Sequence, residues 1–237
     1  MLNTSVLEFP AGNFSDPRRC FPCEITDELP DVPALPETLL TMEFQLQENS
    51  VDLRRFTEVV LADLGATVQI LRLAGQEYRF AEDCPVRIED CIADLGLRAC
   101  FHAAAGGTLG RGSRSRADFE FWTHSREIAR RCRLLAEEVP GSFNPDRAYL
   151  GGLLHALGAL PDVLGWEWDG RTDNGALSAL KLAEQWRFPQ GLRDFYCDLL
   201  IPGQSSLWSK FLVTAHQETR TSWARCPLDP ATKRSFA

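Results

Sequence analysis

Residues 145–158, PDRAYLGGLLHALG, decide the fold of this chain. Asn144 followed by proline is a strong helix start, because asparagine caps the first turn and proline there sacrifices no hydrogen bond. On a helix running to the end of this segment, His155 shares a face with Gly151 and Gly152. A glycine-lined face lets another backbone approach closely, so we expect His155 in a tight internal seam.

The chain on either side of this segment has the pattern of further helices separated by short breakers. Helical spacing of apolar residues, with caps and prolines at the boundaries, indicates helices. The first expected helices are 36–47, then 50–64 capped by Ser50, and a third after Gly65 that ends near Gly75. Two short helices divided at Gly96 follow within 86–104. The remaining helices are expected at 118–138, 145–158, 174–187, 190–200 and 205–224. Strand alternation and internal repeats are not found, so the fold class is all-α with ten to twelve short helices.

The charge balance disfavours two classes of partner. With 25 Lys+Arg against 33 Asp+Glu the net charge is -8, whereas broad binding to nucleic acid or anionic lipid needs a concentrated positive field. The weakly charged stretch 149–166 is too short and too interrupted for a membrane span. We therefore expect neither nucleic-acid nor membrane binding.

Cysteine usage favours a reducing compartment. The eight cysteines form no disulfide framework. Five of them lie in helix-like, largely apolar segments, where a free thiol behaves as a small hydrophobe; they are Cys84, Cys91, Cys100, Cys132 and Cys197. Residues 1–12 lack the basic start and apolar run of a secretory signal, so we expect a cytoplasmic location.

Three histidines fall on inward faces of three different predicted helices. His124 shares a face with Ile128, Cys132 and Leu135, and His216 follows an apolar residue by one turn. Together with His155 they raise the hypothesis of a metal site. The alternative is that the three are core histidines whose ring nitrogens form hydrogen bonds within the protein, which is the commoner role for a histidine on an apolar face.

Six short stretches carry a resemblance to a known family. They are 35–37 LPE, 63–74 DLGATVQILRLA, 88–97 IEDCIADLGL, 122–125 WTHS, 151–155 GGLLH and 183–189 AEQWRFP. Their order and spacing resemble the HDOD domain, the HD-related output domain of bacterial signalling proteins, over about residues 29–224. The resemblance implies an N-terminal helical bundle (29–105) joined to a degenerate HD-type helical bundle (118–225). Together they form an HDOD-like domain (29–225), flanked by an extended segment (1–28) and a tail (226–237).

The departures from that family's hydrolytic relatives bear on function. HD-type hydrolases hold divalent metals with a first histidine, a His-Asp pair and a late aspartate. By resemblance, His124 and His155 occupy the two histidine positions, Ala156 replaces the paired aspartate and His216 falls near the late one. Because the bridging carboxylate holds the metals and lowers the pKa of the attacking water, the resemblance implies a vestigial site without catalysis or cofactor. A single zinc or iron ion held by the three histidines is the alternative, since imidazole suits such metals.

Three further features lie outside the predicted helices. Cys20 and Cys23 have the spacing of half a zinc ribbon or of a redox pair, but no second pair follows and no strand precedes them. The glycine-rich loop 106–116 lacks the lysine of a phosphate-binding P-loop, although its arginines (Arg111, Arg114 and Arg116) are a candidate site for an acidic partner or a phosphate. A solvated loop is the simpler interpretation. The aromatic turn at Trp166 and Trp168 is either a partner patch or packing against the core.

We therefore expect a non-catalytic, HDOD-type regulatory module of bacterial signal transduction, with a signalling protein as partner or a small molecule or nucleotide as ligand. The alternative is a divergent metal-dependent phosphohydrolase or phosphodiesterase acting on a nucleotide or cyclic dinucleotide.

Overall fold

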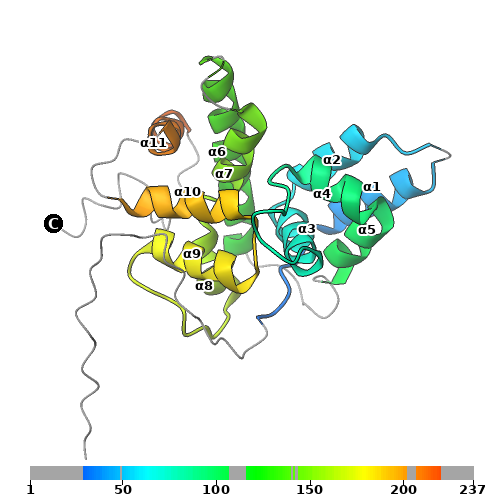
Figure 1. The fold of residues 1–237 in the computed structure, drawn as a ribbon, viewed down its shortest axis with the longest axis horizontal. Helices are drawn as coiled ribbons and strands as arrows, with labels where there is room; N and C mark the ends of the chain where they lie inside the picture. Colours follow the sequence, from blue (N-terminus) through cyan, green and yellow to red (C-terminus); the bar gives the residue numbers. More distant parts are fainter. Residues whose placement is uncertain are drawn as a thin grey trace, which may run out of the picture.

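Eleven α-helices and one 3₁₀ turn, with no strand, make up the part of the chain that the structure describes (Figure 1). This computed structural model describes residues 29–48, 50–106, 116–139, 141, 144–201 and 207–219. The prediction of an all-α fold is confirmed. No helix within those ranges is long and apolar enough to cross a membrane.

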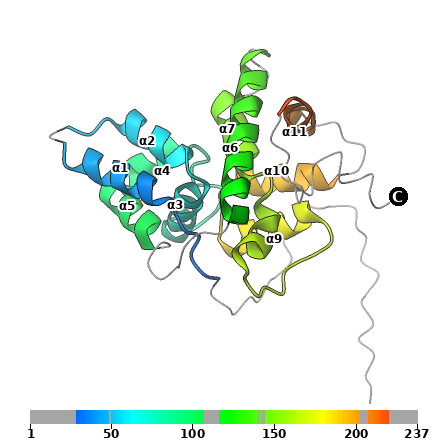
Figure 2. The same cartoon turned by 180° about the vertical axis from the view of Figure 1, so that it is seen from behind.

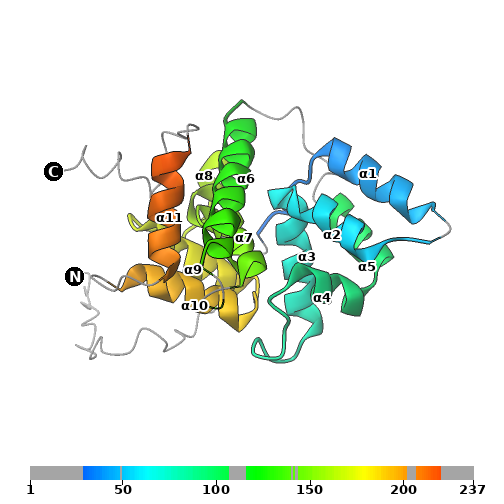
Figure 3. The same cartoon turned by 90° about the horizontal axis from the view of Figure 1, so that it is seen from above.

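The helices form two groups, and the pair α6–α7 is the part of the second group that faces the first (Figures 1 and 2). The first group is α1 (Pro36–Leu46), α2 (Leu53–Leu61), α3 (Leu64–Glu77), α4 (Ile88–Leu95) and α5 (Leu97–Gly106). The second begins with α6 (Arg116–Glu137) and α7 (Pro145–Leu154), and continues through the 3₁₀ turn (Leu157–Ala159), α8 (Leu160–Leu164), α9 (Gly175–Gln185), α10 (Gln190–Leu200) and α11 (Leu207–Glu218). Seen from above, α11 runs beside α6 on the side away from α1–α5 (Figure 3).

The first group differs from the sequence prediction at two caps. Asp52, not Ser50, caps α2, and its carboxylate accepts the amide hydrogens of Arg54 and Arg55. Gly65 does not interrupt a helix, because α3 has already begun at Leu64. A Cβ on Gly65 would lie 2.0 Å from a backbone carbonyl oxygen of the segment that leads into α1, so glycine serves there to allow close packing.

Asp63 joins the two groups of helices. Its side chain is fully buried and caps α3 by accepting the amide hydrogens of Gly65 and Ala66. It also accepts the backbone amide of Leu35 at the start of α1 and, at 3.0 Å, the indole N–H of Trp122 on α6. One carboxylate therefore fixes the relative positions of α1, α3 and α6.

The helix α7 is shorter than predicted. Asn144 caps it and proline occupies its first turn, as expected. It ends at Leu154 rather than Gly158, so His155 is the C-cap residue, and a 3₁₀ turn leads directly into α8. His155 thus lies just past the last residue of α7, next to the 3₁₀ turn.

Candidate functional site

Three histidine side chains from three helices meet in the second group. They are His124 on α6, His155 at the end of α7 and His216 on α11, and their ring centroids are 5.0 to 5.4 Å apart. One ligand nitrogen from each lies within 4.8 Å of the other two. His124 and His155 are buried and His216 is partly so. The three histidines therefore converge on one point.

The glycines of α7 explain this convergence. A Cβ on Gly152 would lie 2.7 Å from the Cα of Ala129 on α6, and one on Gly151 would lie 2.3 Å from the ring of Trp208 on α11. Because both positions lack a side chain, α7 approaches the backbone of α6 on one side and an aromatic ring of α11 on the other. The seam expected around His155 is present, and α11 also packs against it.

Hydrogen bonds to backbone carbonyls fix the orientation of two of the rings. The Nδ1 atom of His155 lies 2.6 Å from the carbonyl oxygen of Gly152, and that of His216 lies 2.7 Å from the carbonyl oxygen of Leu212. When each Nδ1–H donates to its carbonyl, the lone pair is on Nε2, as in most metal-binding histidines.

The environment also sets the charge of His155. Burial, with smaller contributions from the charges of His216 and His124, holds its pKa well below the usual 6.5. His155 is therefore neutral at neutral pH, which is the protonation state that binds metals.

The residues of the cluster do not fit a pair of hard cations. Mg²⁺ and Mn²⁺ favour oxygen ligands, but among the described residues the cluster consists of three imidazoles. Ala156, at the position of the paired aspartate, offers no ligand atom and is almost fully buried. The donor set fits one borderline ion such as Zn²⁺, for which imidazole nitrogens are common ligands.

The remaining predicted features divide into those that the structure describes and those that it does not. Trp166 is buried edge-on against Trp186, and the indole N–H of Trp168 donates to Gln185 at 3.3 Å; this aromatic turn packs against the core. The side chains of Arg111, Arg114 and Arg116, the pair Cys20 and Cys23, and residues 1–28 and 226–237 lie outside the described residues.

The cysteine prediction is confirmed except in one detail of placement. Cys84, Cys91, Cys100, Cys132 and Cys197 are free thiols. Four of them lie in helices, but Cys84 lies in the loop between α3 and α4.

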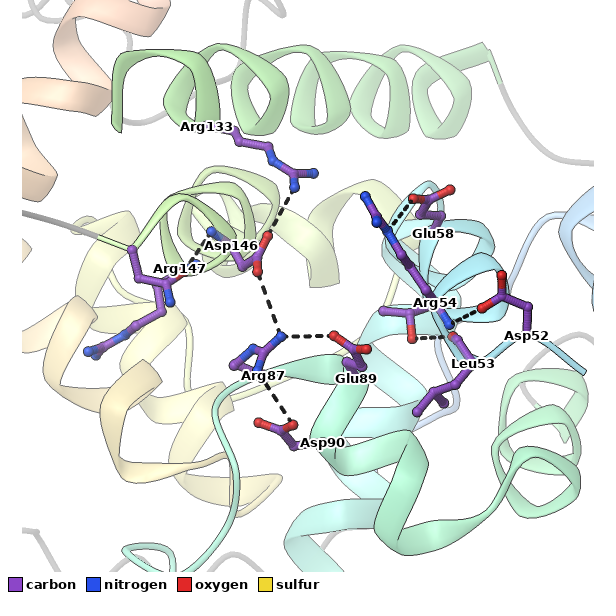
Figure 4. Close-up of polar contacts among 12 residues, drawn as sticks. Asp52, Leu53, Arg54, Glu58, Arg87, Glu89, Asp90, Arg133, Asp146 and Arg147 are labelled. Atoms are coloured by element: carbon purple, nitrogen blue, oxygen red, sulfur yellow. Dashed lines mark hydrogen bonds and ion pairs between the residues drawn. The ribbon is translucent and has the colours of Figure 1, made fainter. Parts of the chain in front are cut away.

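A network of ion pairs between the two groups of helices was not predicted (Figure 4). Asp146 on α7 pairs with Arg133 on α6 at 3.1 Å and with Arg87 at the start of α4 at 4.0 Å. Arg87 also pairs with Glu89 and Asp90. All of these side chains except that of Asp90 border a pocket of about 360 Å³. Arg87 and Asp146 are 59 residues apart in the sequence, so helical spacing gives no signal for their contact.

Comparison with known proteins gives a family and a fold. A family model described as the HDOD domain matches residues 32–163, more than half of the chain. The solved structure of the MmoQ response regulator from Methylococcus capsulatus str. Bath is similar, at 18% identity over 87% of this chain and 98% of that one, with a TM-score of 0.59. A virulence factor from Campylobacter jejuni subsp. jejuni matches at 15% identity over 78% of this chain and 74% of its own, with a TM-score of 0.53. At these identities the likeness is one of fold. No curated protein matches the chain.

Proposed function

The chain belongs to the HDOD-domain family, and from that premise we propose that it is a non-catalytic regulatory module of bacterial signal transduction. It acts in the cytoplasm by binding a signalling protein or a small ligand. Its similarity in fold to a response regulator is in keeping with a signalling role.

The composition of the histidine cluster carries this proposal. HD-type hydrolysis needs carboxylates to hold its cations and to lower the pKa of the attacking water. Here His124, His155 and His216 converge without a carboxylate among the described residues, and Ala156 stands beside them. By the family resemblance, these residues stand where the hydrolases have both histidines and carboxylates, so we infer that the helix packing is kept and the oxygen ligands are replaced.

The test is hydrolysis by the full chain. The purified protein is incubated with Mn²⁺ or Mg²⁺ and a cyclic dinucleotide, and separately with a chromogenic phosphodiester. We expect no turnover above that of a His155→Ala variant. Metal-dependent turnover by the natural protein that disappears in this variant contradicts the proposal.

The convergence of three imidazoles favours one second candidate, a divergent metal-dependent phosphohydrolase with a single Zn²⁺ or Fe²⁺. His124, His155 and His216 would hold the ion, and a metal so bound supplies a Lewis acid and a water of lowered pKa. Of these three, His155 is neutral and carbonyl-oriented, which prepares it to bind without losing a proton.

Elemental analysis separates the two candidates. The second requires close to one tightly bound metal per chain, lost in His155→Ala and retained in His102→Ala. His102 is a matched control, because it is exposed on α5. A metal content below about a tenth of an ion per chain ends the second candidate.

A further inference from the structure

A pocket of about 280 Å³ lies at the seam between the loop that follows α3 and the helices α9 and α10. The loop contributes Arg79 and Cys84, and the other wall contributes Glu184, Arg187 and Arg193. The two walls are already joined, because the backbone amide of Gln190 donates to the carbonyl of Ala81 at 3.0 Å. A ligand in this pocket would contact both groups of helices.

The three arginines of this pocket form no ion pair among the described residues. The guanidinium of Arg187 donates to the carbonyl oxygens of Tyr78 and Arg79 at 3.4 and 3.3 Å, and Nε of Arg193 donates to that of Phe188 at 2.9 Å. The guanidinium of Arg79 lies 5.1 Å from the centre of a neighbouring phenylalanine ring. The remaining N–H groups of these guanidinium ions are therefore not engaged by a carboxylate.

The larger pocket at the same seam provides the contrast (Figure 4). There Arg54 pairs with Glu58 at 3.4 Å, and Asp146 pairs with Arg133 and Arg87. Carboxylates of the protein already hold those guanidinium ions. Of the four arginines that border it, Arg147 alone has no ion pair among the described residues, against all three in the smaller pocket. We therefore assign anion binding to the pocket of Arg79, Arg187 and Arg193, and not to the larger one.

The environment of the Cys84 thiol also bears on anion binding in this pocket. The pKa of this thiol is lowered from 9.0, first by a hydrogen bond from Cys91 and also by the positive charge of Arg193. Burial acts in the opposite direction. Of the causes that lower this pKa, only the positive charge of Arg193 comes from the pocket itself, and Glu82 and Glu184 also border the pocket.

The backbone at Arg187 is held in an unusual conformation. Its φ of 54° lies in the left-handed region, which is disfavoured for residues other than glycine. A Cβ on Gly75 would lie 2.3 Å from the Arg187 carbonyl oxygen, so α3 packs directly on this strained turn. The packing fixes the point from which the Arg187 side chain leaves the backbone.

We propose that the pocket between Arg79, Arg187 and Arg193 binds a diphosphate-sized anion, such as the phosphate end of a nucleotide. Planar guanidinium groups match the oxygen geometry of phosphate and bind it through charge-assisted hydrogen bonds. The volume of about 280 Å³, just below the usual range for small-molecule pockets, suits a diphosphate group better than a whole dinucleotide. Bound there, the anion links the first group of helices to the second, which goes beyond the proposed function.

Calorimetric titration of the full chain at low salt tests this proposal, with inorganic pyrophosphate and a nucleoside diphosphate as separate probes. We expect both to bind with a Kd below about 1 mM. Arg79→Gln weakens binding about tenfold or more, which corresponds to about 1.4 kcal/mol. Binding by pyrophosphate alone limits the site to the free anion, and binding by the nucleotide alone adds recognition of its nucleoside; either result supports the site.

The control is Arg54→Gln, which removes an exposed arginine from the larger pocket and leaves pyrophosphate affinity unchanged. The Arg79 side chain has no hydrogen-bonded partner among the described residues, so its variant is expected to fold; Arg193→Gln provides a second arm. Absence of binding by both probes, or equal losses in Arg79→Gln and Arg54→Gln, overturns the proposal. Either result leaves the non-catalytic function intact, because that rests on the histidine cluster.

Discussion

Replacing Asp63 by alanine is expected to be among the most damaging single changes to this fold. The carboxylate is fully buried and accepts hydrogen bonds from the backbone of α3, from Leu35 at the start of α1 and from the indole of Trp122 on α6. Alanine removes the acceptor for all of these groups at once. The variant should therefore lose both a helix cap and one of the polar contacts between the two groups of helices.

The magnitude follows from these contacts. Loss of a helix N-cap costs about 1 kcal/mol. A buried donor that loses its acceptor costs about 1 to 3 kcal/mol, and both the Leu35 amide and the Trp122 indole lose theirs. We expect Asp63→Ala to lower the free energy of unfolding by about 3 to 7 kcal/mol.

Asp52 provides a matched control. It caps α2 through the same type of hydrogen bonds, to the amides of Arg54 and Arg55, but these bonds are exposed. Asp52→Ala should cost only about 1 kcal/mol. Urea unfolding followed by far-UV circular dichroism gives both values. Equal losses in the two variants would refute the reasoning, since the additional contacts of Asp63 would then contribute nothing.

Three other substitutions test the packing around the histidine cluster. Gly158→Ala should lower the free energy of unfolding by about 2 to 3 kcal/mol, because its Cβ would lie 2.1 Å from the Gly175 carbonyl oxygen; thermal unfolding measures this, and an unchanged Tm contradicts it. Ala156→Asp should lower the free energy of unfolding of the metal-free protein by about 3 kcal/mol, because it buries an uncompensated carboxylate. Urea unfolding measures this, and a decrease below about 1 kcal/mol counts against the burial argument. Tyr196→Phe should cost about 1 kcal/mol, because the buried hydroxyl donates to the Leu154 carbonyl at 2.9 Å; a variant as stable as the natural protein shows that this bond adds no net stability.

Local signals in the sequence predict much of the second group of helices. Asn144 and the proline after it predict where α7 begins, and the glycines Gly151 and Gly152 predict a seam beside His155. These features act between residues close in the sequence, or through the simple absence of a side chain. The end of α7 was missed because its apolar pattern continues through the 3₁₀ turn into α8.

Other features depend on contacts between distant segments. The sequence around Asp63 contains the signal for a cap before Leu64, but the apolar spacing continues across it, and the helix there was predicted as unbroken from residue 50. The same holds for Ser50, which is a good cap by type although Asp52 does the capping. The pairing of Arg87 with Asp146 arises only when the two groups of helices dock.

The histidine cluster lies between these two cases. The inward orientation of His124, His155 and His216 follows from helical periodicity, whereas their meeting at one point requires the packing of α6, α7 and α11. The family resemblance identified the positions. The structure adds the orientations of the His155 and His216 rings and a separation of at most 4.8 Å between the ligand atoms.

Binding of Mn²⁺ to the metal-free full chain, followed by electron paramagnetic resonance, tests the central claim most directly. Mn²⁺ favours oxygen ligands, and the cluster of His124, His155 and His216 offers three imidazoles. We predict no Mn²⁺ bound at this cluster with a Kd below about 1 mM, and identical titrations for the natural protein and His155→Ala. Two Mn²⁺ ions bound per chain with a Kd of about 1 μM, and lost in His155→Ala, would show that the hydrolytic metal centre survives.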